Sequence, residues 1–135
     1  MKLNLDPTAS EWQQKARRFA EEELIPYEVE AEMNGGCLQE EISKKHKKQA
    51  IELGFSAMDV QPEYGGLGLR TVDQVAVWEK LGRVTNALCW CFSEPHQWMF
   101  EACNEDQLQR WVLPLMTGER KECYAITESE SGSDV

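Results

Sequence analysis

The sequence contains no uninterrupted apolar run long enough to cross a bilayer, so a membrane-spanning helix is not expected. Its start also lacks the basic, apolar and small-residue order of a secretory signal, because residues 1–6 pass almost directly into a helical pattern. Apolar residues make up 41% of the 135 positions and charged residues 28%, with a mean hydropathy of -0.55. We therefore expect a soluble globular protein with material for one modest domain.

Residue spacings typical of zinc sites are also missing. The two histidines, His46 and His96, do not form a His-x-x-x-His pair, and the five cysteines include no Cys-x-x-Cys pair. We expect no metal and assign structural or exposed roles to both histidines. Because five cysteines cannot all form disulfides within the chain, a reducing compartment is favoured.

Positive charge is scarce, with 14 Lys and Arg against 24 Asp and Glu and a formal net charge of -10. Nucleic acids are bound by concentrated basic surfaces, so they are disfavoured as partners. The one basic run, residues 44–48, falls within a helical pattern and is interpreted as a solvated helix face.

Apolar residues at helical spacing predict five helices and no internal repeat. In order, they cover about residues 8–33 with a kink at Pro26, 40–53, 71–82, 86–103 and 104–118. Three of them carry a candidate capping box, in which an N-cap side chain and a Glu or Gln three positions later satisfy each other's backbone N–H groups. These pairs are Thr8 with Glu11, Thr71 with Gln74, and Asn104 with Gln107.

The helix over residues 86–103 is strongly apolar and is expected to fill the core. We interpret its large aromatic residues as core residues in preference to the wall of a ligand pocket. They are Trp90, Phe92, Trp98 and Phe100. Residues 62–68, Pro-Glu-Tyr-Gly-Gly-Leu-Gly, are too rich in glycine for a helix. A structural turn is favoured there over a phosphate-binding loop, because the spacing is not that of a dinucleotide fingerprint.

After Arg120 the periodicity changes from that of a helix to that of a strand. We predict an all-α helical domain over residues 1–120 and the first strand and loop of a β-domain over residues 121–135. The strand runs into a Thr-Glu turn and a Gly-Ser-Asp loop, which brings backbone groups, hydroxyls and a flexible glycine together. This arrangement suits a flat heteroaromatic ligand with an attached phosphate, and it equally suits an ordinary solvated turn.

Three motifs along the chain resemble the amino-terminal part of the acyl-CoA dehydrogenases. They are the glycine-rich loop at 62–68, the segment Asp-Gln-Leu-Gln-Arg-Trp at 106–111 that leads through Leu-Pro to Thr-Gly-Glu at 117–119, and Tyr-Ala-Ile-Thr-Glu at 124–128 with Gly-Ser-Asp at 132–134. The resemblance implies the five- to six-helix amino-terminal bundle of that family, followed by the start of its middle β-domain. It covers only part of a family member.

The resemblance also implies FAD as the cofactor, bordered by the segment after Arg120. The backbone of residues 124–127 would lie along the flavin ring, the Thr127 hydroxyl would bond the ring's pyrimidine side, and the glycine and serine would lie near the ribityl-phosphate region. The cofactor-binding residues implied are Tyr124, Ala125, Ile126, Thr127, Gly132 and Ser133. Ser133 would also touch the pantetheine arm of the substrate. The family's glutamate base belongs to a later domain, so we nominate no catalytic residue in this chain.

One departure from the family and one pair of aromatic residues carry expectations of their own. The family usually places proline after the Thr-Glu pair, whereas Ser129 and Glu130 follow here, which predicts a looser, more negative turn and weaker FAD binding. Trp90 and Phe92 lie on the helix that corresponds in order to the one lining the family's acyl pocket. Large aromatic rings there would shorten the pocket, which predicts a preference for short or compact acyl groups.

For a complete enzyme, the resemblance implies α,β-dehydrogenation of an acyl-CoA thioester, an electron transfer flavoprotein as acceptor and a homotetramer. The chain is then a fragment, expected to be inactive alone. Two alternatives stay open: a non-catalytic helical scaffold or interaction module, and a fragment of an acyl-CoA oxidase, which reoxidises its flavin with oxygen. The expected location is the cytoplasm for a bacterial chain or the mitochondrial matrix for a processed eukaryotic one.

Overall fold

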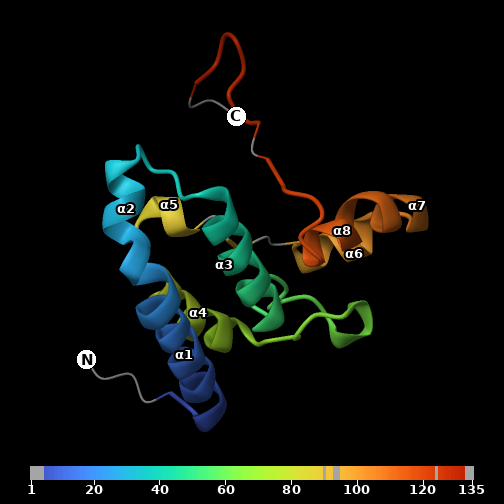
Figure 1. The fold of residues 1–135 in the computed structure, drawn as a ribbon. Coiled ribbons are helices and arrows are strands. Elements are labelled where there is room, and N and C mark those ends of the chain that lie inside the picture. The colour runs from blue at the N-terminus through green and yellow to red at the C-terminus, as the bar shows by residue number, and fades with distance from the viewer. Residues whose placement is uncertain (1–4, 90, 93–94, 124, 133–135) are drawn as a thin grey trace.

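The computed structural model describes residues 5–89, 91–92, 95–123 and 125–132. These residues form an all-α bundle, with α1 to α5 in one group and α6 to α8 in a second (Figure 1), which confirms the predicted fold class. None of the described helices is long and apolar enough to cross a membrane. The helical segments are α1 Pro7–Phe19, η1 Ala20–Leu24, η2 Ile25–Tyr27, α2 Glu28–Met33, α3 Glu40–Glu52, η3 Pro62–Tyr64, α4 Thr71–Leu81, α5 Asn86–Cys89, α6 Gln97–Ala102, α7 Glu105–Gln107, η4 Leu108–Val112 and α8 Leu113–Met116.

The first helix begins at Pro7, and its N-cap is Asp6, two residues before the predicted cap Thr8. Asp6 is the N-cap, and its carboxylate accepts a hydrogen bond from the backbone N–H of Ala9 at 2.9 Å. Pro7 occupies the first helical position, where its fixed φ favours the helix and its missing N–H costs nothing. The predicted box of Thr8 and Glu11 is therefore wrong, because an aspartate followed by proline provides the stronger start.

Two prolines lie within helical runs without ending them. Pro26 and Pro114 each come shortly after a five-residue π-helical turn, η1 and η4 respectively. Proline lacks an N–H and its ring collides with the carbonyl four residues earlier in a regular α-helix, and the wider π turn relieves that conflict. The first run accordingly bends near Pro26 and continues to Met33, as predicted, while the last run continues past the proline that was expected to help close it.

The main core lies among α1, α3, α4 and α5, and its centre is aromatic. The ring of Phe92 meets three other rings nearly edge-on, with centroid distances of 6.2 Å to Phe19, 6.5 Å to Phe55 and 5.7 Å to Trp78. Edge-on pairs bring the positive ring edge against the negative face, so they add specific geometry to the burial of apolar area. Residues far apart in sequence are joined at this point.

One end of the α1 and α4 pair is held by a guanidinium between two carboxylates. Arg70 donates to the α1 cap residue Asp6 at 2.7 Å and makes a two-pronged bond to Asp73 at 2.7 and 2.8 Å. The Asp73 side chain is only 3% exposed, so this geometry is fixed by packing as well as by charge. Because Arg70 occupies the cap position, the predicted box of Thr71 and Gln74 is wrong; the Gln74 amide donates instead to a loop carbonyl at 2.8 Å.

The single buried helix predicted over residues 86–103 is wrong. The structure has two short helices, α5 and α6, and Pro95 lies between them, where its ring and missing N–H are incompatible with a continuous helix. Phe92 and Phe100 are buried, as predicted, but Trp98 is 59% exposed because the break turns α6 away from the main core. Trp90 lies outside the described residues.

A second, smaller cluster joins α6, η4 and the loop before α4. The rings of Tyr64 and Phe100 lie 4.6 Å apart at its centre. The run through α7, η4 and α8 begins with the predicted capping box, in which Asn104 and Gln107 exchange side-chain to backbone hydrogen bonds at 2.9 Å in both directions. All five cysteines are free.

The glycine-rich loop at residues 62–68 folds back on the segment after α3. The N–H of Gly68 donates to the carbonyl of Val60 at 2.8 Å, which closes the loop. Gly66 passes so close to the same residue that a Cβ on it would lie 2.1 Å from the Val60 carbonyl oxygen. The structure therefore confirms the structural turn, and glycine is required by a close backbone approach.

Replacing Gly66 by alanine is expected to lower the free energy of unfolding by about 3 kcal/mol, because the atom in the way is backbone and cannot rotate aside. Gly132→Ala is the matched control, since its added Cβ would meet nothing within 4 Å. Chemical denaturation followed by circular dichroism measures both. Equal stabilities of the two variants would contradict the close approach.

His46 on α3 is fully buried against the ring of Tyr27, with centroids 5.1 Å apart. Within the described residues, neither ring nitrogen has a hydrogen-bond partner. Burial lowers the pKa of His46, and the Lys45 ammonium lowers it further, against the opposing effect of the Glu23 carboxylate. The folded protein therefore favours the neutral imidazole.

We expect the stability to fall as the pH is lowered through about 6.5, the ordinary histidine pKa, because the unfolded chain then binds a proton that the folded chain resists. Each unit by which folding lowers the pKa removes up to about 1.4 kcal/mol once the pH lies below both values. Denaturation curves of the wild type and His46→Leu between pH 5 and 8 measure the effect. A wild-type profile as steep as that of the variant would refute the assignment to His46.

Candidate functional site

The segment after Arg120, predicted to border a flavin, leaves the helices and extends away from them (Figure 1). Its described residues Ala125, Ile126 and Thr127 are exposed and form no strand. A strand needs a hydrogen-bonded neighbour, and within the described chain this segment pairs only with its own following turn. The predicted first strand is therefore not formed there. Tyr124 and Ser133 lie outside the described residues.

A tight turn separates the two halves of the predicted cofactor segment. Glu128 and Ser131 form an isolated antiparallel bridge, and the N–H of Ser131 donates to the Glu128 carbonyl at 3.4 Å. Ser129 and Glu130 are the central residues of this turn, and Gly132 follows it with open space where a Cβ would be. The turn leaves Thr127 on one side and Gly132 on the other, both accessible to a ligand or to another protein segment.

Phe92, one of the two aromatic residues assigned to the acyl pocket by resemblance, lies in the core and not on a pocket wall. Phe92 is 9% exposed and lies in the main core, against Phe19, Phe55 and Trp78. Trp90 lies outside the described residues. The shortened acyl pocket therefore stays a prediction.

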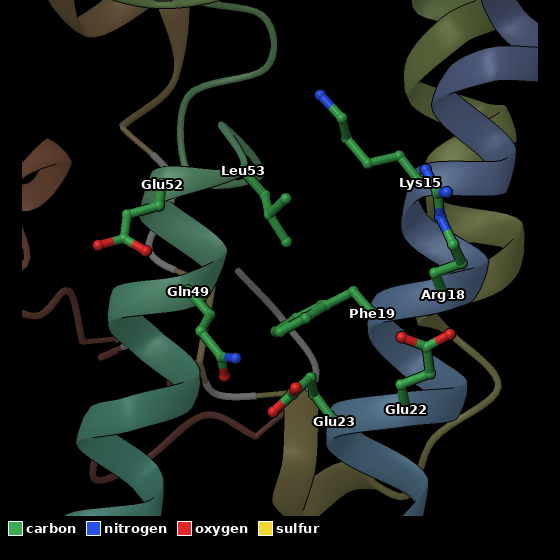
Figure 2. Close-up of a pocket in the computed structure, with 8 residues that line it drawn as sticks. All are labelled: Lys15, Arg18, Phe19, Glu22, Glu23, Gln49, Glu52 and Leu53. Carbon is green, nitrogen blue, oxygen red and sulfur yellow. The ribbon is translucent and has the colours of Figure 1, made fainter.

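A groove of about 500 Å³ between α1 and α3 was not found from the sequence. Figure 2 shows Phe19 and Leu53 extending into the space between the two helices, with charged side chains around them. The residues that line it are Lys15, Arg18, Phe19, Glu22, Glu23, Gln49, Glu52 and Leu53. An apolar floor beneath a rim of both charge signs is typical of a protein contact surface. The signal was hidden because the two walls are more than twenty residues apart in the chain.

Glu23, on one wall of this groove, is held in place by an ion pair. Lys45 donates to the Glu23 carboxylate at 2.7 Å, and this bond, followed by one from Gln49, lowers the pKa of Glu23. The carboxylate thus stays charged at neutral pH, and it has no proton to give to a substrate.

A smaller, more enclosed cavity of about 140 Å³ lies beside α4 and the start of α6. Asp59 accepts a hydrogen bond from the backbone N–H of Gln97 at 3.2 Å, and its carboxylate lies 4.0 Å from the His96 ring nitrogen. The Ser56 hydroxyl also lines the cavity and has no hydrogen-bond partner among the described residues. The cavity has room for a few ordered waters.

Comparison with known proteins gives a consistent result along the chain. Residues 6–119 match the family profile described as the acyl-CoA dehydrogenase N-terminal domain. The short-chain specific acyl-CoA dehydrogenase of Sus scrofa mitochondria is 26% identical over an alignment 145 positions long, which covers 98% of this chain and 32% of that protein. The caffeyl-CoA reductase-Etf complex subunit CarC of Acetobacterium woodii is 28% identical, with 88% of this chain and 31% of that protein covered.

A crystal structure of an acyl-CoA dehydrogenase complexed with FAD, from Bacillus anthracis, is similar in fold, with a TM-score of 0.77 and 28% identity. The match covers 97% of this chain and 22% of that one. The chain spans about a third of the length of the curated relatives it matches.

Phe92 is buried in the core whereas Ile126 is exposed, so substitutions at the two positions should change the free energy of unfolding by different amounts. Phe92→Ala should lower the free energy of unfolding by about 3 to 5 kcal/mol, because it leaves a cavity among three rings. Ile126→Ala should change it by less than about 0.5 kcal/mol, because Ile126 is 51% exposed. Urea denaturation of both variants measures the difference, and a large loss in Ile126→Ala would show that the segment packs on the helices.

Proposed function

Because the chain belongs to the acyl-CoA dehydrogenase family, we propose that it is the amino-terminal helical domain, with the entry to the middle domain, of an FAD-dependent enzyme that oxidises an acyl-CoA thioester between its α and β carbons. The observation that carries the proposal is the match of residues 6–119 to the family's amino-terminal domain. The fold agrees with it, since the TM-score of 0.77 to an FAD-complexed member spans nearly the whole chain.

The described residues of the segment after Arg120 are compatible with a flavin edge. Ala125 to Thr127 are exposed, so their backbone N–H and C=O groups are accessible, and Gly132 has open space at its Cα. In this proposal the residues that hold FAD are Tyr124, Ala125, Ile126, Thr127, Gly132 and Ser133. Bound there, FAD would supply the redox chemistry of the reaction.

Beside this redox role of FAD, the residues of this chain bind and orient the cofactor and the substrate. The Thr127 hydroxyl would hold the polar side of the flavin ring, and Ser133 would hold both the cofactor and the pantetheine arm of the acyl-CoA. No residue of the chain takes the role of the base that removes the α-proton, because we propose that a later domain supplies it. The activity therefore requires more polypeptide than these residues.

The proposed partners follow from the relatives. The name of the Acetobacterium woodii relative places that protein in a complex with an electron transfer flavoprotein, which supports such a protein as electron acceptor here. An acyl-CoA substrate and assembly as a homotetramer complete the proposal. A bacterial relative and a mitochondrial one support either the bacterial cytoplasm or the mitochondrial matrix as the location.

One observation agrees equally well with a second function, an interaction module that binds another protein through its helices. Large apolar side chains are exposed on α2 and α4, with exposed fractions of 76% for Val29, 85% for Met33 and 61% for Val75. Missing domains of an enzyme and a separate partner would both cover such side chains, so exposure does not separate the two functions. Binding of FAD does separate the two functions, because only the enzyme fragment is expected to bind it.

The test is a titration of the purified 135-residue chain with FAD, followed by quenching of flavin fluorescence. We expect weak, saturable binding that Thr127→Ala weakens further, because the hydroxyl bond to the ring is lost. Thr8→Ala is the matched control, an exposed threonine at the far end of α1.

A third variant, Ser129→Pro, addresses the predicted looseness of the turn. Proline fixes φ at the first central position of the turn, so it is expected to tighten FAD binding. A folded chain that shows no saturable quenching, or one in which Thr127→Ala and Thr8→Ala behave alike, would contradict the proposed cofactor role of this segment and favour the interaction module.

A further inference from the structure

A basic cavity of about 340 Å³ lies between α3 and the loop after α8, in a chain whose net charge is -10. Three of its lining residues are lysines on one face of α3. The lining residues are Lys44, Lys47, Lys48, Ile51, Glu52, Thr117 and Gly118. This cavity is separate from the segment that we propose to hold the flavin, and the inference drawn from it does not depend on that proposal.

The far wall of the cavity is held in place by Gly118. Its φ is +77°, and a Cβ on it would lie 2.9 Å from both Ile51 Cδ1 and Lys47 Cε. A residue with a side chain would be strained at this φ, and the ends of the Ile51 and Lys47 side chains would have to shift to make room for it. Two backbone bonds of 3.1 Å, from Gly118 to Leu115 and from Arg120 to Pro114, close the loop. The wall is therefore a defined part of the fold.

Lys47 is the lysine of this group whose charge is not balanced. Lys44 pairs with Glu40 at 2.6 Å, and Lys48 lies 3.8 Å from Glu52. Lys47 is partly buried, and its ammonium donates to the backbone carbonyl of Arg120 at 3.4 Å. Within the described residues it has no carboxylate at ion-pair distance.

A second cation, Lys121, adds to the unpaired positive charge of Lys47. Burial lowers the pKa of Lys47, and the nearby charge of Lys121 lowers it further. Lys44 and, to a smaller extent, the charge of Lys121 also lower the pKa of Glu40, and Glu52 lines the cavity, but these two carboxylates are paired with Lys44 and Lys48. The remaining like charges create a positive potential, and an anion in the cavity would relieve it. The same anion would stabilise the charged form of Lys47.

We propose that this cavity is a binding site for a phosphate-bearing anion, with Lys47 as the central ligand and Lys121, which does not line the cavity, as a nearby positive charge. Ammonium groups bind phosphate oxygens as point charges with several donors each. The volume accommodates one or two phosphate groups with water, since a water molecule takes about 30 Å³ of liquid volume. Free inorganic anions and the phosphates of a small nucleotide share this chemistry.

The experiment is a calorimetric titration of the chain with inorganic pyrophosphate at pH 7. Saturable binding is expected, and Lys47→Met should weaken it about tenfold through the loss of one charge-assisted bond while keeping the apolar stem against Gly118. Lys45→Met is the matched control, because Lys45 lies on the same helix but pairs with Glu23. Lys121→Gln gives an independent variant at an exposed position that does not threaten the fold.

Sulfate, whose charge is constant over the range, tests the linkage to Lys47. Its affinity should fall as the pH is raised through the lowered pKa of Lys47, and the fall should move to higher pH in Lys121→Gln. Comparing pyrophosphate with adenosine 3′,5′-bisphosphate identifies the source of the phosphate, and preferential binding of either supports the site. Absence of saturable binding, unchanged binding in Lys47→Met, or equal losses in Lys47→Met and Lys45→Met would overturn the proposal.

Discussion

The contact on which the rest of the structure depends is the set of edge-on rings around Phe92. Phe19 comes from α1, Phe55 from the segment after α3 and Trp78 from α4, so a single side chain joins three elements that are distant in sequence. Short helices do not persist alone in water, and α5 and α6 gain their stability from such packing. The same contact removes Phe92 from any role at the surface.

Backbone constraints around this core decide the shape of the connections. The loop after α3 can return to Val60 only because Gly66 has no side chain, and the loop after α8 turns at Gly118 with a φ of +77°, a conformation that favours glycine. π-helical turns before Pro26 and Pro114 let helical runs bend and continue. Connections of this kind fix where the charged face of α3 and the open groove beside α1 are placed.

The helical part and the segment after it follow different rules. Helices satisfy their backbone hydrogen bonds internally, so the bundle forms from residues 5–120 by its own contacts. A strand has to share its hydrogen bonds with a neighbour, and residues 125–127 have no such neighbour within the described chain. That difference explains why the described residues of the most family-specific motif, 125–128 and 132, form no strand and lie away from the helices.

The sequence by itself determined the helical class, the Asn104 capping box, the bend at Pro26 and the turn at residues 62–68, because local spacing and the conformational limits of proline and glycine act over a few residues. It also carried the family resemblance. The Asp6 cap before Pro7 and the break at Pro95 are also local effects, which the predicted helix bounds did not take into account. Only the tertiary structure decided that Arg70 holds Asp6 at the start of α1, and that Trp98 is exposed while Phe92 is buried. These outcomes depend on contacts between distant residues, such as Arg70 with Asp6, which a reading of local periodicity does not include. The groove beside α1 and the basic cavity on α3 were invisible for the same reason, since each is formed by two segments that meet only in the folded chain.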